Sequence, residues 1–180
     1  MRCDDLPGGA LADAWAEFVG RYRWDCFATL TWRSGVGLGE ESAIKSFRFW
    51  LWRWMACEAV RLGLARWESQ RLRGRWAKRH SRGQVAAVPI WVVGIERHRS
   101  RRIHLHALLK YPVDLGDMSR RTGWSIWYDL HGRARLERPR SQGDVAGYVS
   151  KYVAKGGDVV VSESFNAARL PIWEPGGKVP

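Results

Sequence analysis

The stretch that decides the fold is VPIWVVGIERHRSRRIHLHALLK, residues 88–110. Two apolar runs, 88–97 and 103–110, flank the polar and basic segment 98–102. Both runs are rich in β-branched and aromatic residues, and this pattern predicts two strands. The short polar segment between them predicts that the strands are antiparallel neighbours. Pro89 fits this interpretation because proline is tolerated at the start of a strand.

Outside this stretch the chain alternates between strand-like and helix-like patterns. Further strands are expected where aromatic and β-branched residues alternate or cluster, at 24–32, 134–138 and 158–162. Helices are expected where apolar residues recur every three or four positions, at 10–22, 40–64, 115–130 and 142–155. This order predicts an α+β, RRM-like fold with a central antiparallel sheet and helices packed on it. No second core is evident, so a single domain is expected over 1–162, followed by an irregular tail, 163–180.

The composition favours a protein that binds nucleic acid. Among 180 residues, 30 Lys and Arg outnumber 18 Asp and Glu, which gives a net charge of +12. Such an excess of positive charge is typical of nucleic-acid-binding domains, although a basic protein is also attracted to a membrane surface or to an acidic protein. No stretch resembles a membrane span or a signal peptide. Three widely spaced cysteines suggest free thiols in a reducing cytoplasm, so a cytoplasmic protein is expected.

Residues 47–54, FRFWLWRW, interleave aromatic and cationic side chains. Unpaired bases stack on aromatic faces of this kind, so the segment is a candidate contact for single-stranded nucleic acid. The same spacing is that of an amphipathic helix whose aromatic residues fill the core. We favour the core interpretation.

His104 and His106 are candidate metal ligands. The period of two along a strand places both imidazoles on one face of the sheet. If Ser100 lies at the tip of the connection, Glu96 pairs with His104 and Gly94 with His106. The first pair adds a carboxylate, and the second adds a position without a side chain where a ligand can approach. Two imidazoles and one carboxylate predict a divalent metal site for Mn²⁺ or Mg²⁺ with open coordination positions, and Zn²⁺ is also compatible.

Tyr148 and Tyr152 are candidate nucleophiles on the last predicted helix. They are four residues apart, so both phenols leave one face of that helix. Each is followed three residues later by a lysine, Lys151 and Lys155, which can favour a phenolate and contact a phosphate. The alternative is that the tyrosines flank a buried stripe beginning at Val145 and simply pack on the sheet. Of the two, Tyr148 is our first choice for an initial attack.

Together these motifs resemble the HUH endonuclease superfamily, specifically its rolling-circle replication initiators with two tyrosines. The first motif of that family resembles 27–32, FATLTW. The second resembles His104-Leu105-His106 with Glu96 upstream as a third ligand, and the third resembles 148–155, YVSKYVAK. The resemblance covers residues from about 24 to 162 and keeps the motifs in order.

The resemblance implies a metal-dependent enzyme that nicks and joins single-stranded DNA. The metal ligands would be Glu96, His104 and His106, and one of the two tyrosines would attack the phosphate. The protein would then remain on the 5′-phosphate and free a 3′-hydroxyl that primes synthesis. The implied partner is origin DNA in single-stranded, hairpin form. No Walker A sequence is present in the chain, so if the chain is complete the helicase would be a separate protein. A separate polymerase is the other expected partner.

Three alternatives remain at this point. A transposase of the same superfamily would share the chemistry and differ in the DNA ends that it joins. A non-catalytic RRM-like module would use tryptophans and tyrosines to stack bases. A structural metal-binding protein is disfavoured by the lack of clustered cysteines.

Overall fold

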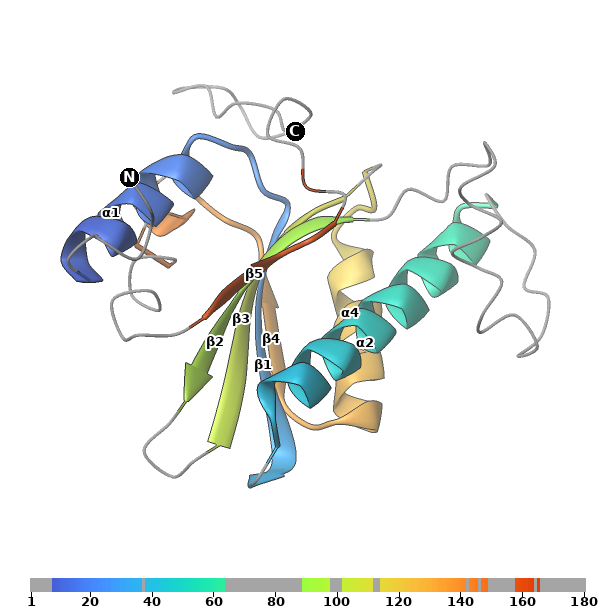
Figure 1. The fold of residues 1–180 in the computed structure, drawn as a ribbon. Coiled ribbons are helices and arrows are strands. Elements are labelled where there is room, and N and C mark those ends of the chain that lie inside the picture. The colour runs from blue at the N-terminus through green and yellow to red at the C-terminus, as the bar shows by residue number, and fades with distance from the viewer. Residues whose placement is uncertain are drawn as a thin grey trace.

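Antiparallel strands form the sheet on which the helices pack (Figure 1). The computed structural model describes residues 8–36, 38–63, 89–97, 102–111, 114–141, 143–145, 147–148, 158–163 and 165. Within these residues the strands are β1 (Cys26–Val36), β2 (Ile90–Arg97), β3 (Arg102–Lys110), β4 (Ala134–Glu137) and β5 (Val159–Val161). The helices are α1 (Gly8–Gly20), α2 (Glu40–Arg61) and α4 (Met118–Leu130). Residues 143–145 and 147–148 are also helical.

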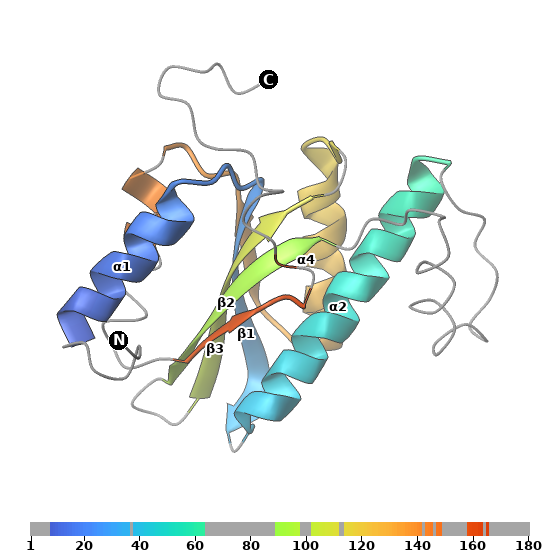
Figure 2. The ribbon, with the colours of Figure 1, turned by 45° about the horizontal axis from the view of Figure 1, so that its top comes forward.

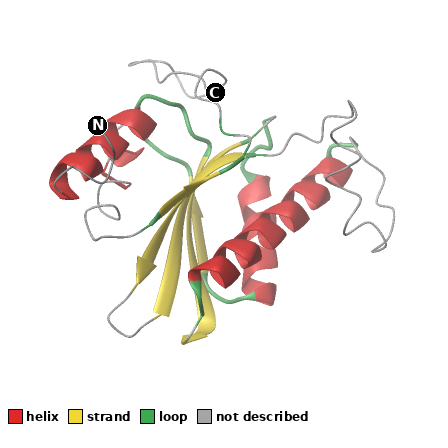
Figure 3. Ribbon diagram, in the orientation of Figure 1, coloured by secondary structure: helices red, strands yellow, loops and turns green. Residues whose placement is uncertain are grey.

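The strand order is β4-β1-β3-β2-β5, and every neighbouring pair is antiparallel. The predicted α+β class with a central antiparallel sheet and packed helices is therefore confirmed (Figure 3). Strand β1 runs four residues beyond its predicted end, from Trp32 to Val36. Most of the predicted helix 142–155 and of the predicted tail 163–180 lies outside the described residues. Within the described ranges, no helix is long and apolar enough to span a membrane.

The predicted pairing of β2 with β3 is confirmed residue by residue. Glu96 lies opposite His104, and Gly94 lies opposite His106. A slip of one residue would send every side chain of a strand to the opposite face, so a strand with one apolar face has a strongly specified register. In β3 that face carries Ile103 and Leu105, both fully buried.

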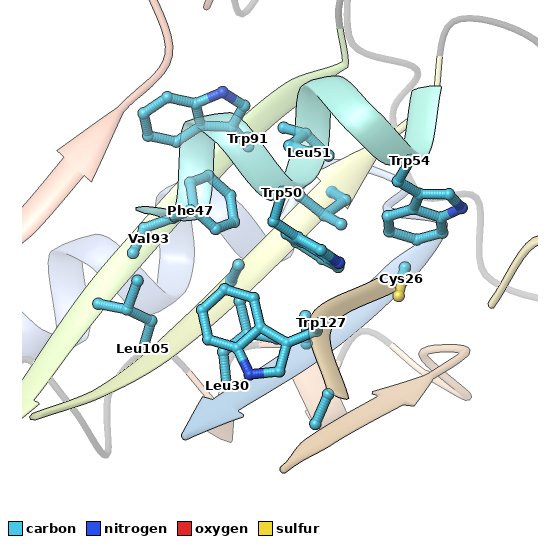
Figure 4. Packing of buried hydrophobic residues seen from close by; sticks show 14 of the residues in the cluster. Cys26, Leu30, Phe47, Trp50, Leu51, Trp54, Trp91, Val93, Leu105 and Trp127 are labelled. Atoms are coloured by element: carbon cyan, nitrogen blue, oxygen red, sulfur yellow. The ribbon is translucent and has the colours of Figure 1, made fainter. Parts of the chain in front are cut away.

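Helices α2 and α4 cover one face of the sheet, and α1 lies on the other side (Figure 2). The core between the sheet and α2 takes Phe47, Trp50 and Trp54 from the FRFWLWRW segment, all fully buried. Figure 4 shows these rings packed together with Trp127 of α4. The core interpretation of this segment is thus confirmed for these three rings, whereas Trp52 is half-buried and Phe49 is exposed. Their burial dominates the stability of this layer, since aromatic side chains bury more area than any others.

A smaller cluster packs between α1, residues 143–148 and the opposite face of the sheet. It contains buried residues from four separate segments of the chain, Ala12, Val19, Trp24, Phe27, Val92, Leu108 and Val145. Tyr148 packs against this cluster. The cluster therefore ties Val145 and Tyr148 to the centre of the sheet.

Gly123 of α4 approaches the ring of Trp54 closely. A Cβ atom built at Gly123 would lie 2.6 Å from Cε2 of Trp54. The backbone carbonyl of Gly123 also accepts a hydrogen bond of 2.8 Å from Nε1 of Trp50. The contact between α2 and α4 therefore depends on a position without a side chain.

Gly123→Ala is expected to lower the free energy of unfolding. In an open helix this change would stabilise by about 1 kcal/mol. Here the added methyl group collides with a buried ring, and overpacking of this kind costs about 1–3 kcal/mol. Urea denaturation of Gly147→Ala provides the control, because a Cβ at that helical glycine meets no described residue within 4 Å. Equal or higher stability of Gly123→Ala would contradict the described packing.

His131, just after α4, is half-buried among aromatic rings. Its ring centroid lies 4.6 Å from that of Trp127 and 6.0 Å from that of Trp32. Nε2 is buried and has no hydrogen-bond partner within the described part of the chain. Burial lowers the pKa of His131 from the ordinary value of 6.5, because desolvation penalises the imidazolium.

The neutral His131 ring is expected to make stability depend on pH. Its contribution is complete above pH 6.5, where the unfolded chain also holds a neutral imidazole. It is lost as the pH falls from 6.5 towards the lowered pKa of the folded protein, because the unfolded chain then binds the proton more readily. The unfolding free energy of the wild type should therefore fall relative to that of His131→Phe across this window. A difference that does not change with pH would contradict the assignment.

Candidate metal and nucleophile site

The candidate metal ligands lie on the sheet face opposite the α2 and α4 core. Residues directly opposite in an antiparallel pair share a face, so Thr31, His104 and Glu96 form one row across β1, β3 and β2. The next row contains Thr29, His106 and Gly94 in the same three strands. Their chain neighbours Leu30, Leu105 and Ile95 point into the core on the other side. Three strands thus place polar side chains together on one face.

Glu96 and His106 are in direct contact. Oε2 of Glu96 lies 2.9 Å from Nε2 of His106. The residue directly opposite Glu96 is His104, and His106 lies opposite Gly94. The carboxylate of Glu96 therefore extends diagonally across the strands to reach His106. The side chain of His106 is 6% exposed and that of Glu96 is 20% exposed. An imidazole and a carboxylate therefore meet in a largely desolvated environment, where their electrostatic interaction is stronger than in water.

Both histidines turn Nδ1 towards a threonine of β1. Nδ1 of His104 lies 3.0 Å from Oγ1 of Thr31, and Nδ1 of His106 lies 3.4 Å from Oγ1 of Thr29. Both threonines belong to the first motif, FATLTW, but the sequence pattern predicts no role for them. One signal in the sequence could have identified them. Thr-x-Thr and His-x-His have the same spacing of two residues, so on neighbouring strands both pairs of side chains can lie on one face of the sheet.

Tyr148 reaches the same face from the helical residues 143–148. Its hydroxyl donates a hydrogen bond of 2.9 Å to the carbonyl of Ala28 and lies 3.2 Å from Oγ1 of Thr29. Its ring stacks on Phe27 with a centroid distance of 4.3 Å and meets the His106 ring edge-on at 5.7 Å. The structure therefore brings one of the two predicted tyrosines beside the predicted metal ligands.

The remaining candidate catalytic residues are Lys151, Tyr152 and Lys155. All three lie outside the described residues. Their proposed roles rest on the sequence alone.

The contact between Glu96 and His106 fits two adjacent ligands of one divalent cation. Ligand atoms about 2.1 Å from a cation, and at right angles to each other, lie about 3 Å apart. The observed separation of 2.9 Å is close to this value. Throughout the described ranges, no three His, Cys, Asp or Glu side chains converge into a ready-made metal cluster. His104 would have to complete the set through Nε2, since its Nδ1 faces Thr31.

Replacement of Glu96 is expected to weaken the binding of Mn²⁺. Glu96→Gln removes the charge and keeps the shape, and the loss should be about 10-fold or more, since even outer-shell partners of a metal contribute about 10–100-fold. The measurement is titration of Mn²⁺ by electron paramagnetic resonance. The control is Glu41→Gln, which removes an exposed carboxylate of α2 that pairs with Lys45. Equal affinities of wild type and Glu96→Gln would remove Glu96 from the site.

Comparison with known proteins returns no relative for this chain. No protein-family model matches it, no curated protein matches it, and no solved structure matches it. Its function must therefore be argued from its own residues and their geometry.

Proposed function

We propose that this chain is a metal-dependent endonuclease that nicks and joins single-stranded DNA, with the HUH variant of the RRM-like fold. Its biological task would be the initiation of rolling-circle replication. The observation that carries the proposal is the convergence of Glu96, His106 and Tyr148 on one sheet face. These residues come from three segments of the chain, and each type is needed for cleavage through a phosphotyrosine.

Glu96, His104 and His106 would hold Mn²⁺ or Mg²⁺, which supplies Lewis-acid polarisation of the scissile phosphate when bound. The phenolic oxygen of a tyrosine attacks phosphorus, and its proton passes to a base or to solvent. The bond from phosphorus to the 3′-oxygen breaks, and the 3′-oxygen takes up a proton. The 5′-phosphate stays esterified to the tyrosine, so the reverse attack by a 3′-hydroxyl rejoins DNA without ATP.

The lysines of the third motif would stabilise negative charge in this reaction. Lys151 and Lys155 each follow a tyrosine by three residues, which is one helical turn. An ammonium group at that distance stabilises a phenolate and contacts the non-bridging oxygens of a phosphate. Both interactions become stronger as negative charge develops on the phenolic oxygen and on the phosphate.

The contacts of Tyr148 bear on the order in which the tyrosines act. A backbone carbonyl cannot remove the phenolic proton, because it accepts a hydrogen bond without being a useful base. Tyr148 therefore has to leave Ala28 before it can attack. Tyr148 stays our first candidate for the initial nick, with loss of the Ala28 contact as a required step, and Tyr152 lies outside the described residues.

Arg135 offers a phosphate contact next to the site. It lies opposite Thr29 on β4 and so extends the row that contains His106. Its side chain is 72% exposed and pairs with Glu137 at 2.7 Å. An exposed ion pair of this kind stabilises a protein little, so the guanidinium can exchange its partner for DNA phosphate.

The rival interpretation is a non-catalytic RRM-like module that stacks bases on its sheet. Phe27, an aromatic residue on the relevant face, is 8% exposed and is covered by Tyr148. A ring in that position cannot take a base unless Tyr148 moves away. A transposase of the same superfamily would share all the chemistry above and would differ in requiring transposon ends as substrate.

The nuclease proposal predicts a covalent adduct with DNA. Wild-type protein incubated with Mn²⁺ and a pool of labelled single-stranded oligonucleotides should give a product that resists denaturant. The double variant Tyr148→Phe, Tyr152→Phe should give none, whereas Tyr128→Phe on α4 should react normally. His106→Ala should lose cleavage and keep most of the DNA affinity, since lysine and arginine contacts to phosphates supply that affinity.

Tight binding of DNA by the wild type without any adduct would favour the stacking module. An adduct that survives in the double tyrosine variant would mean that another residue is the nucleophile.

A further inference from the structure

A continuous set of hydrogen bonds connects Tyr148 to His106 through Thr29. The Tyr148 hydroxyl lies 2.9 Å from the carbonyl oxygen of Ala28 and 3.2 Å from Oγ1 of Thr29. The same Oγ1 lies 3.4 Å from Nδ1 of His106. The predicted nucleophile and a predicted metal ligand thus share one hydroxyl group.

The direction of each bond follows from counting protons. The carbonyl of Ala28 can only accept, so the single hydroxyl proton of Tyr148 goes to it. The contact between Tyr148 and Thr29 then needs the single proton of Thr29. Thr29 has no proton left for His106, so Nδ1–H of His106 must be the donor in the last contact.

For a neutral ring, this direction selects one tautomer of His106. A neutral imidazole with its proton on Nδ1 carries its lone pair on Nε2. Nε2 is the atom that lies 2.9 Å from the carboxylate of Glu96. A lone pair and a carboxylate at that separation repel each other unless a proton or a metal cation lies between them. A proton makes the ring an imidazolium that donates to Glu96, and a metal cation makes Nε2 and the carboxylate its ligands. In both cases Nδ1–H faces Thr29, so the relay of hydrogen bonds through Thr29 keeps Nε2 turned towards Glu96, where a cation can replace the proton.

We propose that Thr29 is a positioning residue that holds His106 in its metal-binding tautomer, with Tyr148 fixing the direction of the Thr29 hydroxyl. This inference rests on the proposed function, because it takes His106 as a metal ligand. The neighbouring row repeats the arrangement, since Oγ1 of Thr31 lies 3.0 Å from Nδ1 of His104. The first motif thereby orients the second, and Tyr148 serves the metal site even while it is not attacking DNA.

The first test reads the tautomer directly, without metal or DNA. Nitrogen-15 NMR of the histidine side chains at alkaline pH, where imidazole is neutral, should place the proton of His106 on Nδ1 in the wild type. Thr29→Ser keeps the hydroxyl and should keep this tautomer. Thr29→Val removes the acceptor, so the proton should move to Nε2, where Glu96 accepts it. An unchanged tautomer in Thr29→Val would overturn the proposal.

The second test measures the affinity for Mn²⁺. Thr29→Val should bind about 10–100-fold more weakly than the wild type, the usual loss when an outer-shell partner of a ligand is removed. Thr29→Ser should restore most of the affinity. Tyr148→Phe should also weaken binding, because it frees the Thr29 hydroxyl to donate to Nδ1. Thr122→Val on α4, a half-buried threonine remote from the site, is the matched control and should bind as the wild type does.

The two tests separate this proposal from the nuclease proposal. A DNA adduct with wild-type protein, together with an unchanged tautomer and unchanged Mn²⁺ affinity in Thr29→Val, would refute the relay and leave the nuclease standing. The expected tautomer shift and loss of Mn²⁺ affinity, without any DNA adduct, would support the relay and refute the nuclease.

Discussion

The antiparallel pairing of β2 with β3 is the constraint on which the rest of the structure depends. The pairing sets Glu96 opposite His104 and Gly94 opposite His106. The period of two along each strand then divides the side chains into two groups. One group enters the aromatic core under α2 and α4, and the other forms the polar face that carries the candidate site. A slip of one residue would exchange the groups and place the histidines in the aromatic core, so the stability of the core also enforces the geometry of the site.

The core supports the site through its rigidity. Trp50 and Trp54 of α2 are fully buried, and their indole nitrogens are satisfied by the carbonyl of Gly123 and the hydroxyl of Ser119. Close-packed interiors with satisfied polar groups hold their elements in one arrangement. The strands above this layer are therefore held firmly enough to keep small polar contacts on their other face. The tryptophans thus support the site from the opposite face without taking part in it.

On the polar face, the proposed reaction depends on side-chain contacts made by residues, such as threonine, that are not themselves metal ligands or nucleophiles. Threonine would attract no attention in a search for catalytic groups. Here Oγ1 of Thr29 contacts both a candidate metal ligand, His106, and a candidate nucleophile, Tyr148. In the proposed arrangement it accepts from the first and donates to the second, which links the metal site to the attacking group. Under the proposed function the same contacts give Tyr148 two tasks, because its hydroxyl would first orient Thr29 and only later attack. A two-tyrosine enzyme would then have a reason to keep its tyrosines distinct.

The sequence by itself determined the class of fold and the approximate positions of the strands, because both follow from local periodicity. It predicted the pairing of Glu96 with His104 only on the condition that Ser100 lies at the tip of the connection, and the structure then confirmed that register. The sequence also marked the tyrosines, because spacing along a helix is local information. Only the tertiary structure decided that β1 lies between β3 and β4 and brings Thr29 and Thr31 to the histidines. It alone also decided that the Tyr148 hydroxyl contacts Ala28, 120 positions away in the chain. A periodic pattern predicts which face a side chain takes, but the partner across that face depends on which distant strand is inserted beside it.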